Sequence, residues 1–225
     1  MVRAIVTDIE GTTTSLSFVK DVLFPYSTRH LPGFVRSQGH RPEVRQLLDE
    51  ARQLAGGAVD DEGLVGVLLK WIEKDQKLAP LKGLQGLLWE EGYLQGAFQG
   101  HVYEDAARRL REWHQQGLRL YVYSSGSEHA QRLIFGHTPF GDLTPLFSGY
   151  FDTRVGGKKE APSYAAIVRE LGLPAEEVLF LSDVREELDA ASAAGLRTWC
   201  LARGEGPAVD PGAHPVARSF NEVHP

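Results

Sequence analysis

Three apolar runs in this chain of 225 residues are each followed at once by side chains that bind metal ions or phosphate groups. These side chains are Asp8 and Glu10, Ser124 and Ser125, and Asp183. Carboxylate oxygens are good ligands for Mg²⁺, which also accepts phosphate oxygens and water. Hydroxyl groups, and backbone amides of a glycine-containing turn such as 124–127, bind phosphate oxygens. The pattern therefore predicts a site for a phosphate group and a hard cation.

The charges of such a site can be assigned from the chemistry. A phosphoester repels a carboxylate that approaches it, so a divalent ion must lie between them. Asp8, Glu10 and Asp183 can supply oxygens to that ion. The transferred group also needs positive charge and hydrogen-bond donors. We expect Lys158 and the two serines to provide them.

The elements that must position these residues alternate between strand and helix. Apolar runs predict strands at 2–7, 118–123, 178–181 and 198–201, and helical spacing predicts helices at 104–116, 128–135, 163–171 and 186–194. Strands that alternate with helices form a parallel sheet, and its ligands bind beyond the carboxyl ends of the strands. We therefore expect an α/β core made of residues 1–14 and 105–225.

The intervening residues, 15–104, carry only helical signals. Apolar residues between 42 and 54 have helical spacing, with Pro42 at the start and two glycines after the end. Further helices are predicted at 64–73 and 81–90. The chain is thus expected to carry a helical domain inserted after its first strand.

Composition narrows the class of protein. Thirty acidic residues against 24 basic ones give a net charge of −6, which argues against a nucleic-acid partner. The single cysteine, Cys200, allows no intrachain disulfide, and no apolar run approaches the length of a signal peptide or a membrane span. We expect a cytoplasmic monomer that binds neither membranes nor nucleic acid.

Some of these features also fit simpler structural roles. The turn 124–127 can cap the helix that follows it, and Glu187 can be a first-turn helix residue or a support for the site. A P-loop is excluded because Lys158 is followed by Lys159 and not by Ser or Thr. The turn also lacks the GxSxG pattern of α/β-hydrolases, and the eight histidines show no zinc-binding spacing.

The order of the motifs resembles that of the haloacid dehalogenase superfamily: an acidic pair, a strand-ending serine, a lysine and a final acid. Six segments look like its enolase-phosphatase branch in particular: DIEGTTT, SFVKDVLFPY, LKGLQGLLWEEGY, YSSGSEHAQRLIFG, LFSGYFDTRVGGKKE and FLSD. In this branch a glutamate, here Glu10, stands where most phosphatases of the superfamily have a second aspartate. The lysine that matches the family spacing is Lys158, two positions before Glu160.

The resemblance implies a fold, a cofactor and a substrate. The fold is a Rossmann-like parallel-sheet core with an inserted helical cap, 15–104, and the cofactor is one Mg²⁺ per subunit, held by Asp8, Glu10 and Asp183. The substrate is 2,3-diketo-5-methylthiopentyl-1-phosphate, a small phosphoester of methionine salvage, which is enolised and then hydrolysed to the acireductone. The alternative is another Mg²⁺-dependent phosphatase, or a dehalogenase, of the same superfamily.

The resemblance also implies roles for individual residues. Asp8 is the expected nucleophile, Glu10 the acid and then the base, and Lys158 both a catalytic and a substrate-binding residue beside Ser124 and Ser125. Five less specific candidates complete the set: Glu187 near the last acid, and Lys20, Lys82, Gln85 and Trp89 in the helical insertion.

Overall fold

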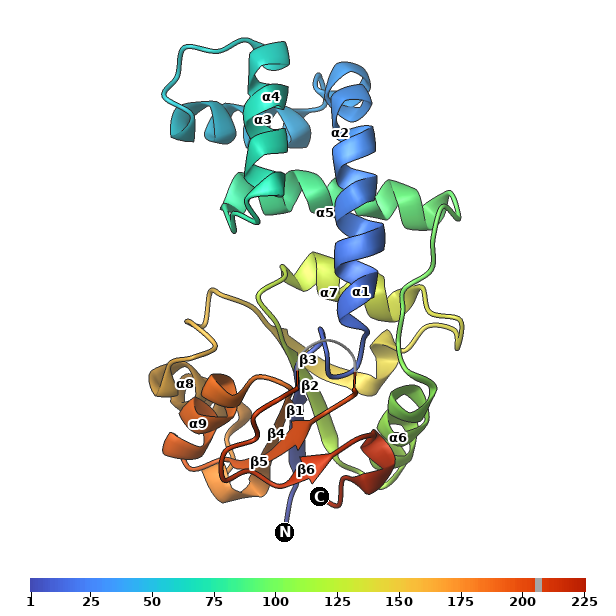
Figure 1. The fold of residues 1–225 in the computed structure, drawn as a ribbon, viewed down its shortest axis with the longest axis vertical. Helices are drawn as coiled ribbons and strands as arrows, with labels where there is room; N and C mark the ends of the chain where they lie inside the picture. The colour runs from blue at the N-terminus through green and yellow to red at the C-terminus, as the bar shows by residue number, and fades with distance from the viewer. Residues whose placement is uncertain (205–207) are drawn as a thin grey trace. The chain divides into compact units, whose positions relative to one another are not determined.

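The computed structural model describes residues 1–204 and 208–225 and divides into two compact units (Figure 1). Residues Met1–Leu16 and Gln99–Pro225 form the first unit, and Ser17–Phe98 form the second. The second unit is thus an insertion that begins shortly after the first strand.

The first unit is built on a parallel sheet with strand order β3-β2-β1-β4-β5-β6. Its strands are β1 (Ala4–Thr7), β2 (Arg119–Tyr123), β3 (Phe147–Phe151), β4 (Val178–Ser182), β5 (Arg197–Leu201) and β6 (Val216–Ala217). The central strands β1 and β4 are fully buried, as expected where helices cover both faces of a sheet. The predicted α/β fold with a parallel sheet is confirmed.

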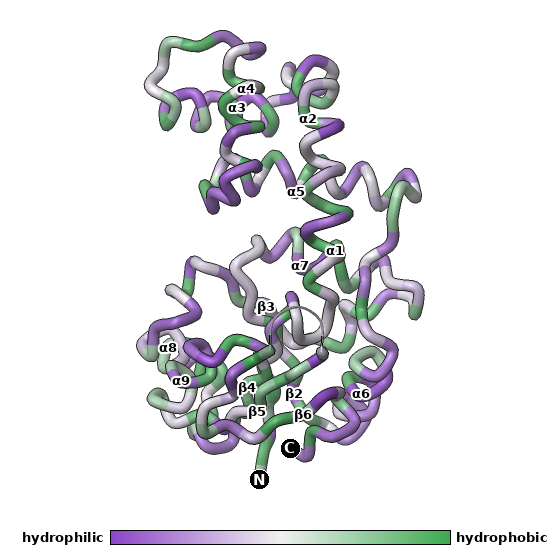
Figure 2. Tube along the Cα trace, in the orientation of Figure 1, coloured by the Kyte–Doolittle hydropathy of each residue, from purple (hydrophilic) through white to green (hydrophobic). Residues whose placement is uncertain are grey.

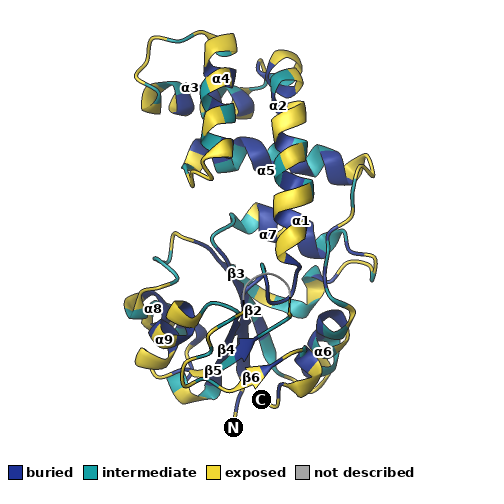
Figure 3. Ribbon diagram, in the orientation of Figure 1, coloured by how far each residue is buried: buried dark blue, intermediate teal, exposed yellow. Residues whose placement is uncertain are grey.

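In the described residues of this unit, the α-helices are α6 (Glu104–Gln115), α7 (Glu128–Gly136), α8 (Ala161–Leu171) and α9 (Arg185–Ala193). Short 3₁₀ segments also occur: η2 (Thr144–Leu146), η3 (Ala175–Glu177) and η4 (Phe220–Glu222). Helices α8 and α9 lie on one side of the sheet and α6 on the other (Figure 1). Their apolar sides pack on the strands, and their outer sides are polar and exposed (Figures 2 and 3).

The core under α8 and α9 holds this unit together. Tyr164, Ile167 and Leu188 pack with Val6 and Phe180, and none of the five side chains is exposed to solvent. Each such burial contributes about 1.5–3 kcal/mol relative to exposure. The rigid sheet that results is what places the strand ends.

The second unit consists of helices around a core of its own. A short helix α1 (Leu16–Phe18) and a π-helical turn η1 (Val19–Leu23) lead into α2 (Phe24–Gln38), which is followed by α3 (Pro42–Leu54), α4 (Asp61–Glu73) and α5 (Ala79–Leu94). Asp60 caps α4 by accepting a hydrogen bond from the Gly63 amide at 2.8 Å. In the described part of the chain, no helix is long and apolar enough to cross a bilayer.

Strands β3 and β6 are absent from the sequence-based prediction. Ser148 and Gly149 interrupt the apolar pattern of β3, and β6 has only two residues, so neither contains a run that periodicity can detect. The helix predicted at 42–54 is confirmed with the same bounds, because proline at its start and glycines after its end mark both termini.

We expect Leu48→Ala to lower the free energy of unfolding of the second unit by about 2–5 kcal/mol, because it empties a fully buried position of α3. Leu54 in the same helix is 58% exposed, so Leu54→Ala is the matched control and should change stability by less than about 0.5 kcal/mol. Urea unfolding followed by circular dichroism measures both variants. Equal losses would show that Leu48 does not carry the packing assigned to it.

Candidate active site

The register of three neighbouring strands brings the predicted site residues to one edge of the sheet. Thr7, the last residue of β1, is paired with Val122 in β2 and with Leu181 in β4. The Asp8 amide then donates a hydrogen bond to the Leu181 carbonyl at 2.9 Å. Since all three strands run in parallel, the residues that follow them leave the sheet at the same edge.

The turn after β1 is closed by its own hydrogen bonds. The amides of Thr12, Thr13 and Thr14 all donate to the Ile9 carbonyl, at 3.2, 3.0 and 2.9 Å. The Thr13 hydroxyl donates to the Asp8 carbonyl at 3.2 Å, and the Thr12 hydroxyl lies 3.5 Å from Asp8 Oδ2. All three threonines are fully buried, so this turn holds Asp8 in a rigid frame.

Gly11 lets this turn approach the end of β4. Its φ of +75° lies in the left-handed region, and a Cβ at this position would lie 2.2 Å from Asp183 Oδ2. No other residue fits that conformation and that space. Glu10 lies in the same turn, with its backbone bridged to Thr14.

Lys158 forms the central ion pair of the site. Its Nζ lies 2.5 Å from Asp8 Oδ1 and 2.8 Å from Glu187 Oε2, and the three side chains are almost completely buried. Burial by itself lowers the pKa of an ammonium group, but the charges of Asp8 and Glu187 outweigh it and hold the pKa of Lys158 above its usual value. Lys158 is therefore a permanent cation against Asp8.

The loop that carries Lys158 is held by a buried tyrosine. The Tyr164 hydroxyl in α8 donates to the Lys158 carbonyl at 2.6 Å. Glu187 is fixed in turn by the Ser182 hydroxyl, which donates to the same Oε2 at 2.8 Å. Glu187 lies in the first turn of α9, as the first of its two sequence-based roles requires, and it forms an ion pair with Lys158; its support of the site stays a prediction.

The site has more carboxylates than cations. Burial, and then the negative charge of Asp8, raise the pKa of Asp183 to about 7 and that of Glu187 to about 7. Asp183 Oδ1 is buried and has no hydrogen-bond partner among the described residues. An unsatisfied carboxylate oxygen beside a second carboxylate fits a divalent cation.

The described side chains, those of this site included, contain no group of three or more His, Cys, Asp or Glu that could hold a metal ion. Mg²⁺ commonly takes only one or two protein carboxylates and completes its shell with phosphate oxygens and water. Asp8 and Asp183 are consistent with such a site.

The serines after β2 occupy a turn that is fixed by its own hydrogen bonds. Ser124 is buried, and its Oγ accepts the Gly126 amide at 3.1 Å, while Ser127 caps α7 by accepting the Ala130 amide at 3.3 Å. The predicted capping role of this turn is thus confirmed. In the described residues, no hydrogen bond links Ser124 or Ser125 to Asp8 or Lys158.

A buried glutamine supports this turn and was not found from the sequence. Gln131 in α7 donates through Nε2 to the Gly126 carbonyl at 2.9 Å and to the Phe151 carbonyl at 2.8 Å. Its only signal in the sequence is a polar residue on the apolar side of a helix, and that pattern is too common to indicate a site.

The remaining candidates lie in the second unit. Lys20 lies in η1, and Lys82, Gln85 and Trp89 lie in α5. Gln85 and Trp89 are buried, and the Trp89 indole donates to the Leu23 carbonyl at 3.0 Å. Trp89 therefore has a structural contact inside this unit.

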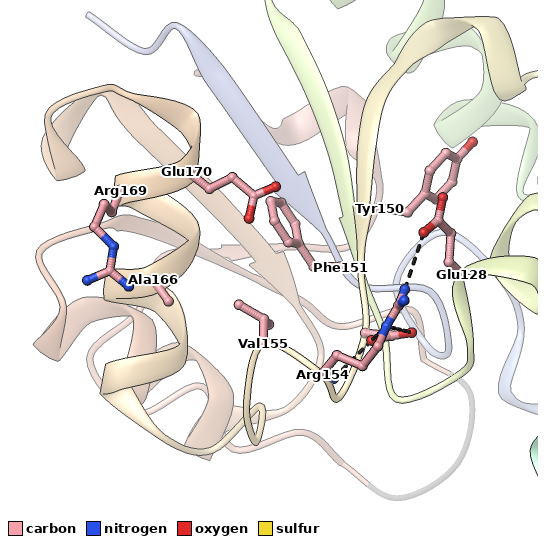
Figure 4. Close-up of a pocket in the computed structure, with 9 residues that line it drawn as sticks. Glu128, Tyr150, Phe151, Arg154, Val155, Ala166, Arg169 and Glu170 are labelled. Atoms are coloured by element: carbon pink, nitrogen blue, oxygen red, sulfur yellow. Dashed lines mark hydrogen bonds and ion pairs between the residues drawn. The ribbon is translucent and has the colours of Figure 1, made fainter. Parts of the chain in front are cut away.

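Two pockets of the first unit are lined by charged side chains. Figure 4 shows one of about 630 Å³, lined by residues of β3, α7, α8 and the loop after β3, and none of the predicted site residues. Its Arg154 points to Glu128 and also binds Asp152, at 3.3 and 2.9 Å, so its charge is already balanced. The other, of about 540 Å³, is lined by Asp183 and the start of α9 and is mainly acidic. Neither pocket offers an unpaired cluster of cations for a phosphate.

A parallel sheet with a buried Asp–Lys–Glu group at its carboxyl edge is typical of a known class of hydrolases. Residues 2–195 match the family model of haloacid dehalogenase-like hydrolases, and the chain belongs to that family. It is 63% identical to enolase-phosphatase E1 of Thioalkalivibrio sulfidiphilus over 99% of both chains, and 55% identical to that of Methylococcus capsulatus over 100% and 99%. Within the hydrolases, it is a member of the enolase-phosphatase E1 family.

A solved structure has the same architecture throughout. The UTR4 protein of Saccharomyces cerevisiae superimposes with a TM-score of 0.85 at 36% identity, and the match covers 99% of this chain and 100% of that one. Membership in this family implies a divalent metal ion, which agrees with the unsatisfied oxygen of Asp183.

We expect Gly11→Ala to abolish phosphate release, because the new Cβ must displace either the turn or Asp183. Gly117→Ala is the matched control, since Gly117 also has a positive φ, +85°, but no atom lies within 4 Å of the place that its new methyl group would take. Both variants should lose about 1–2 kcal/mol of stability from backbone strain. Thermal unfolding and a colorimetric phosphate assay on p-nitrophenyl phosphate separate the two effects, and full activity in Gly11→Ala would refute the close approach.

Proposed function

We propose that this chain acts on 2,3-diketo-5-methylthiopentyl-1-phosphate, enolises it and hydrolyses the phosphate to give the acireductone 1,2-dihydroxy-3-keto-5-methylthiopentene of methionine salvage. Whole-length relatives at 63% and 55% identity carry the name enolase-phosphatase. The observation that carries the proposal is the buried ammonium of Lys158 against Asp8, with Asp183 at the neighbouring strand end. In such a group, the ammonium can bind a phosphate and the carboxylate of Asp8 can attack it.

In this proposal Asp8 is the nucleophile. Lys158 holds its Oδ1, and Oδ2, 3.5 Å from the Thr12 hydroxyl, attacks the phosphorus. The phosphorus–oxygen bond to the substrate breaks, and Glu10 gives a proton to the leaving oxygen. Glu10 then takes a proton from water, which attacks the aspartyl phosphate, releases inorganic phosphate and restores Asp8.

Charge neutralisation completes this site. A Mg²⁺ ion, one per subunit, would be held by Asp8 and Asp183, with Glu10 as a further ligand, and would reduce the repulsion between nucleophile and phosphate. Lys158 neutralises charge on the transferred group, and Ser124 and Ser125 donate hydrogen bonds to it.

We also propose roles for the two units. Residues Met1–Leu16 and Gln99–Pro225 serve as the catalytic core, and Ser17–Phe98 serve as the cap that excludes water from the enol. Lys20, Lys82, Gln85 and Trp89 are its candidates for recognition of the diketone. The protein works as a monomer in the cytoplasm, in keeping with its single buried cysteine.

We expect the diketone phosphate to be converted with release of phosphate and appearance of the ultraviolet absorbance of the enediol. EDTA should stop turnover, and added Mg²⁺ should restore it, because an ion held by Asp8 and Asp183 would reduce the repulsion between the carboxylates and the phosphate. A panel of other phosphoesters serves as the comparison. Faster turnover of another phosphoester would support a different phosphatase of the same superfamily, and turnover unchanged by EDTA would refute the metal site.

We expect Glu187→Gln to lower kcat by about tenfold, since a charge-assisted hydrogen bond to Lys158 contributes about 1.5–3 kcal/mol. The neighbouring Glu186→Gln is the matched control, because Glu186 is exposed and lies 3.6 Å from Lys159. Its kcat should stay within twofold of the parent. Steady-state phosphate release measures both, and equal effects would show that Glu187 does not position Lys158.

A further inference from the structure

An arginine outside all the motifs makes contact with the turn of Asp8. Arg203 follows β5, and only 6% of its side chain is exposed. Its Nε donates to the Thr12 carbonyl at 2.9 Å, across a sequence separation of 191 residues. A buried backbone carbonyl needs such a donor, and here the donor comes from the far end of the chain.

Three further contacts fix the guanidinium itself. Arg203 pairs with Asp105 at 2.7 Å, and it lies over the rings of Tyr103 and Phe220, 4.2 and 5.1 Å from their centroids. The Asp105 carboxylate also accepts the Phe220 amide at 2.7 Å, so it is fixed as well. A guanidinium with an ion pair at one edge and two aromatic rings packed against it has little freedom, and it can therefore set the position of what it binds.

The carbonyl that Arg203 binds belongs to Thr12, whose side chain lies next to the carboxylate of Asp8. The Thr12 hydroxyl is 3.5 Å from Asp8 Oδ2, and the Thr12 amide closes the turn by donating to the Ile9 carbonyl. The next carbonyl, that of Thr13, accepts the Tyr103 amide at 2.9 Å. Thr12 and Thr13 are thus tied to Arg203 and to the segment 103–105, which also holds Arg203.

We propose that Arg203 is a positioning residue for the nucleophile: by binding the Thr12 carbonyl it fixes the turn that directs Asp8 Oδ2. This inference rests on the proposed function only in taking Asp8 as the nucleophile. An ordinary structural role predicts a loss of stability alone, whereas a positioning role predicts a loss of kcat that exceeds the loss of stability.

Lysine at this position separates the two roles. An arginine presents several N–H groups in a rigid plane and can bind Asp105 and Thr12 together, while a lysine has one ammonium on a flexible stem. Arg203→Lys should therefore keep the ion pair with the partly buried Asp105, and with it the fold, but lose the bond to Thr12. Arg203→Met, which removes both donors, is the more severe variant, and Arg203→Lys decides the question if Arg203→Met does not fold.

A matched control exists in the same unit. Arg109 of α6 is also largely buried, lies 5.0 Å from the Trp113 ring and pairs with Glu112 at 2.5 Å. In the part of the chain that the structure describes, it forms no hydrogen bond or ion pair with the Asp8 turn. We expect Arg203→Lys to lower kcat for the diketone phosphate by about 10- to 100-fold, the effect of a displacement of about 1 Å, with KM within about threefold. Arg109→Lys should shift the unfolding temperature to a similar extent and leave kcat within twofold.

A second readout does not depend on the substrate. Beryllium trifluoride, added with Mg²⁺, forms an adduct with a correctly placed aspartate carboxylate and is observed by ¹⁹F NMR. The parent protein and Arg109→Lys should form the adduct, Asp8→Asn should not, and Arg203→Lys should form it at least about fivefold less. If the parent forms the adduct but does not turn over the diketone phosphate, the proposed substrate is wrong and Arg203 is still tested.

Three results with the substrate would overturn the proposal. The first is a kcat of Arg203→Lys within twofold of the parent value. The second is an effect of Arg203→Lys on KM alone. The third is a loss of kcat in Arg109→Lys equal to that in Arg203→Lys when both variants have the same unfolding temperature. A normal adduct in folded Arg203→Lys would overturn it as well, whatever the outcome with the substrate.

Discussion

The buried contact between Lys158 and Asp8 is the interaction on which the rest of the site depends. An ammonium and a carboxylate out of water are tolerated only as a closely bonded pair, because each loses several kcal/mol of hydration. The partners are 150 residues apart, so the fold must form before the pair can. Tyr164 holds the lysine's loop, the threonine turn holds the aspartate, and Glu187 supplies a second negative charge.

This pair leaves the site with an excess of negative charge. Glu187 is buried and Asp183 is partly buried near Asp8, and both have pKa values raised to about 7 by burial and by the charge of Asp8. Like charges packed in this way oppose folding, and the cores of the two units offset them through apolar burial. The same excess suits a bound divalent cation, which would in turn reduce the repulsion of a phosphate, so the charges that oppose folding favour binding of the cation.

Much of the fold could be predicted from the sequence. The strands β1, β2, β4 and β5 are short apolar runs, and the helices that separate them have helical spacing, so a parallel sheet follows. Strands β3 and β6 could not be predicted, since Ser148 and Gly149 break one pattern and the other strand has two residues. These strands lie at the outer edges of the final order, where neighbours already in place complete the pairing.

The sequence by itself determined the chemistry available at the strand ends, the family, and the residue types of Asp8, Lys158 and Asp183. Only the tertiary structure decided which groups meet. It pairs Lys158 with Asp8 while the adjacent Lys159 lies exposed near Glu186, and it brings Arg203 to the Thr12 carbonyl. Such contacts depend on the directions of side chains across elements distant in sequence, and these directions are set by packing and strand register and not by local spacing.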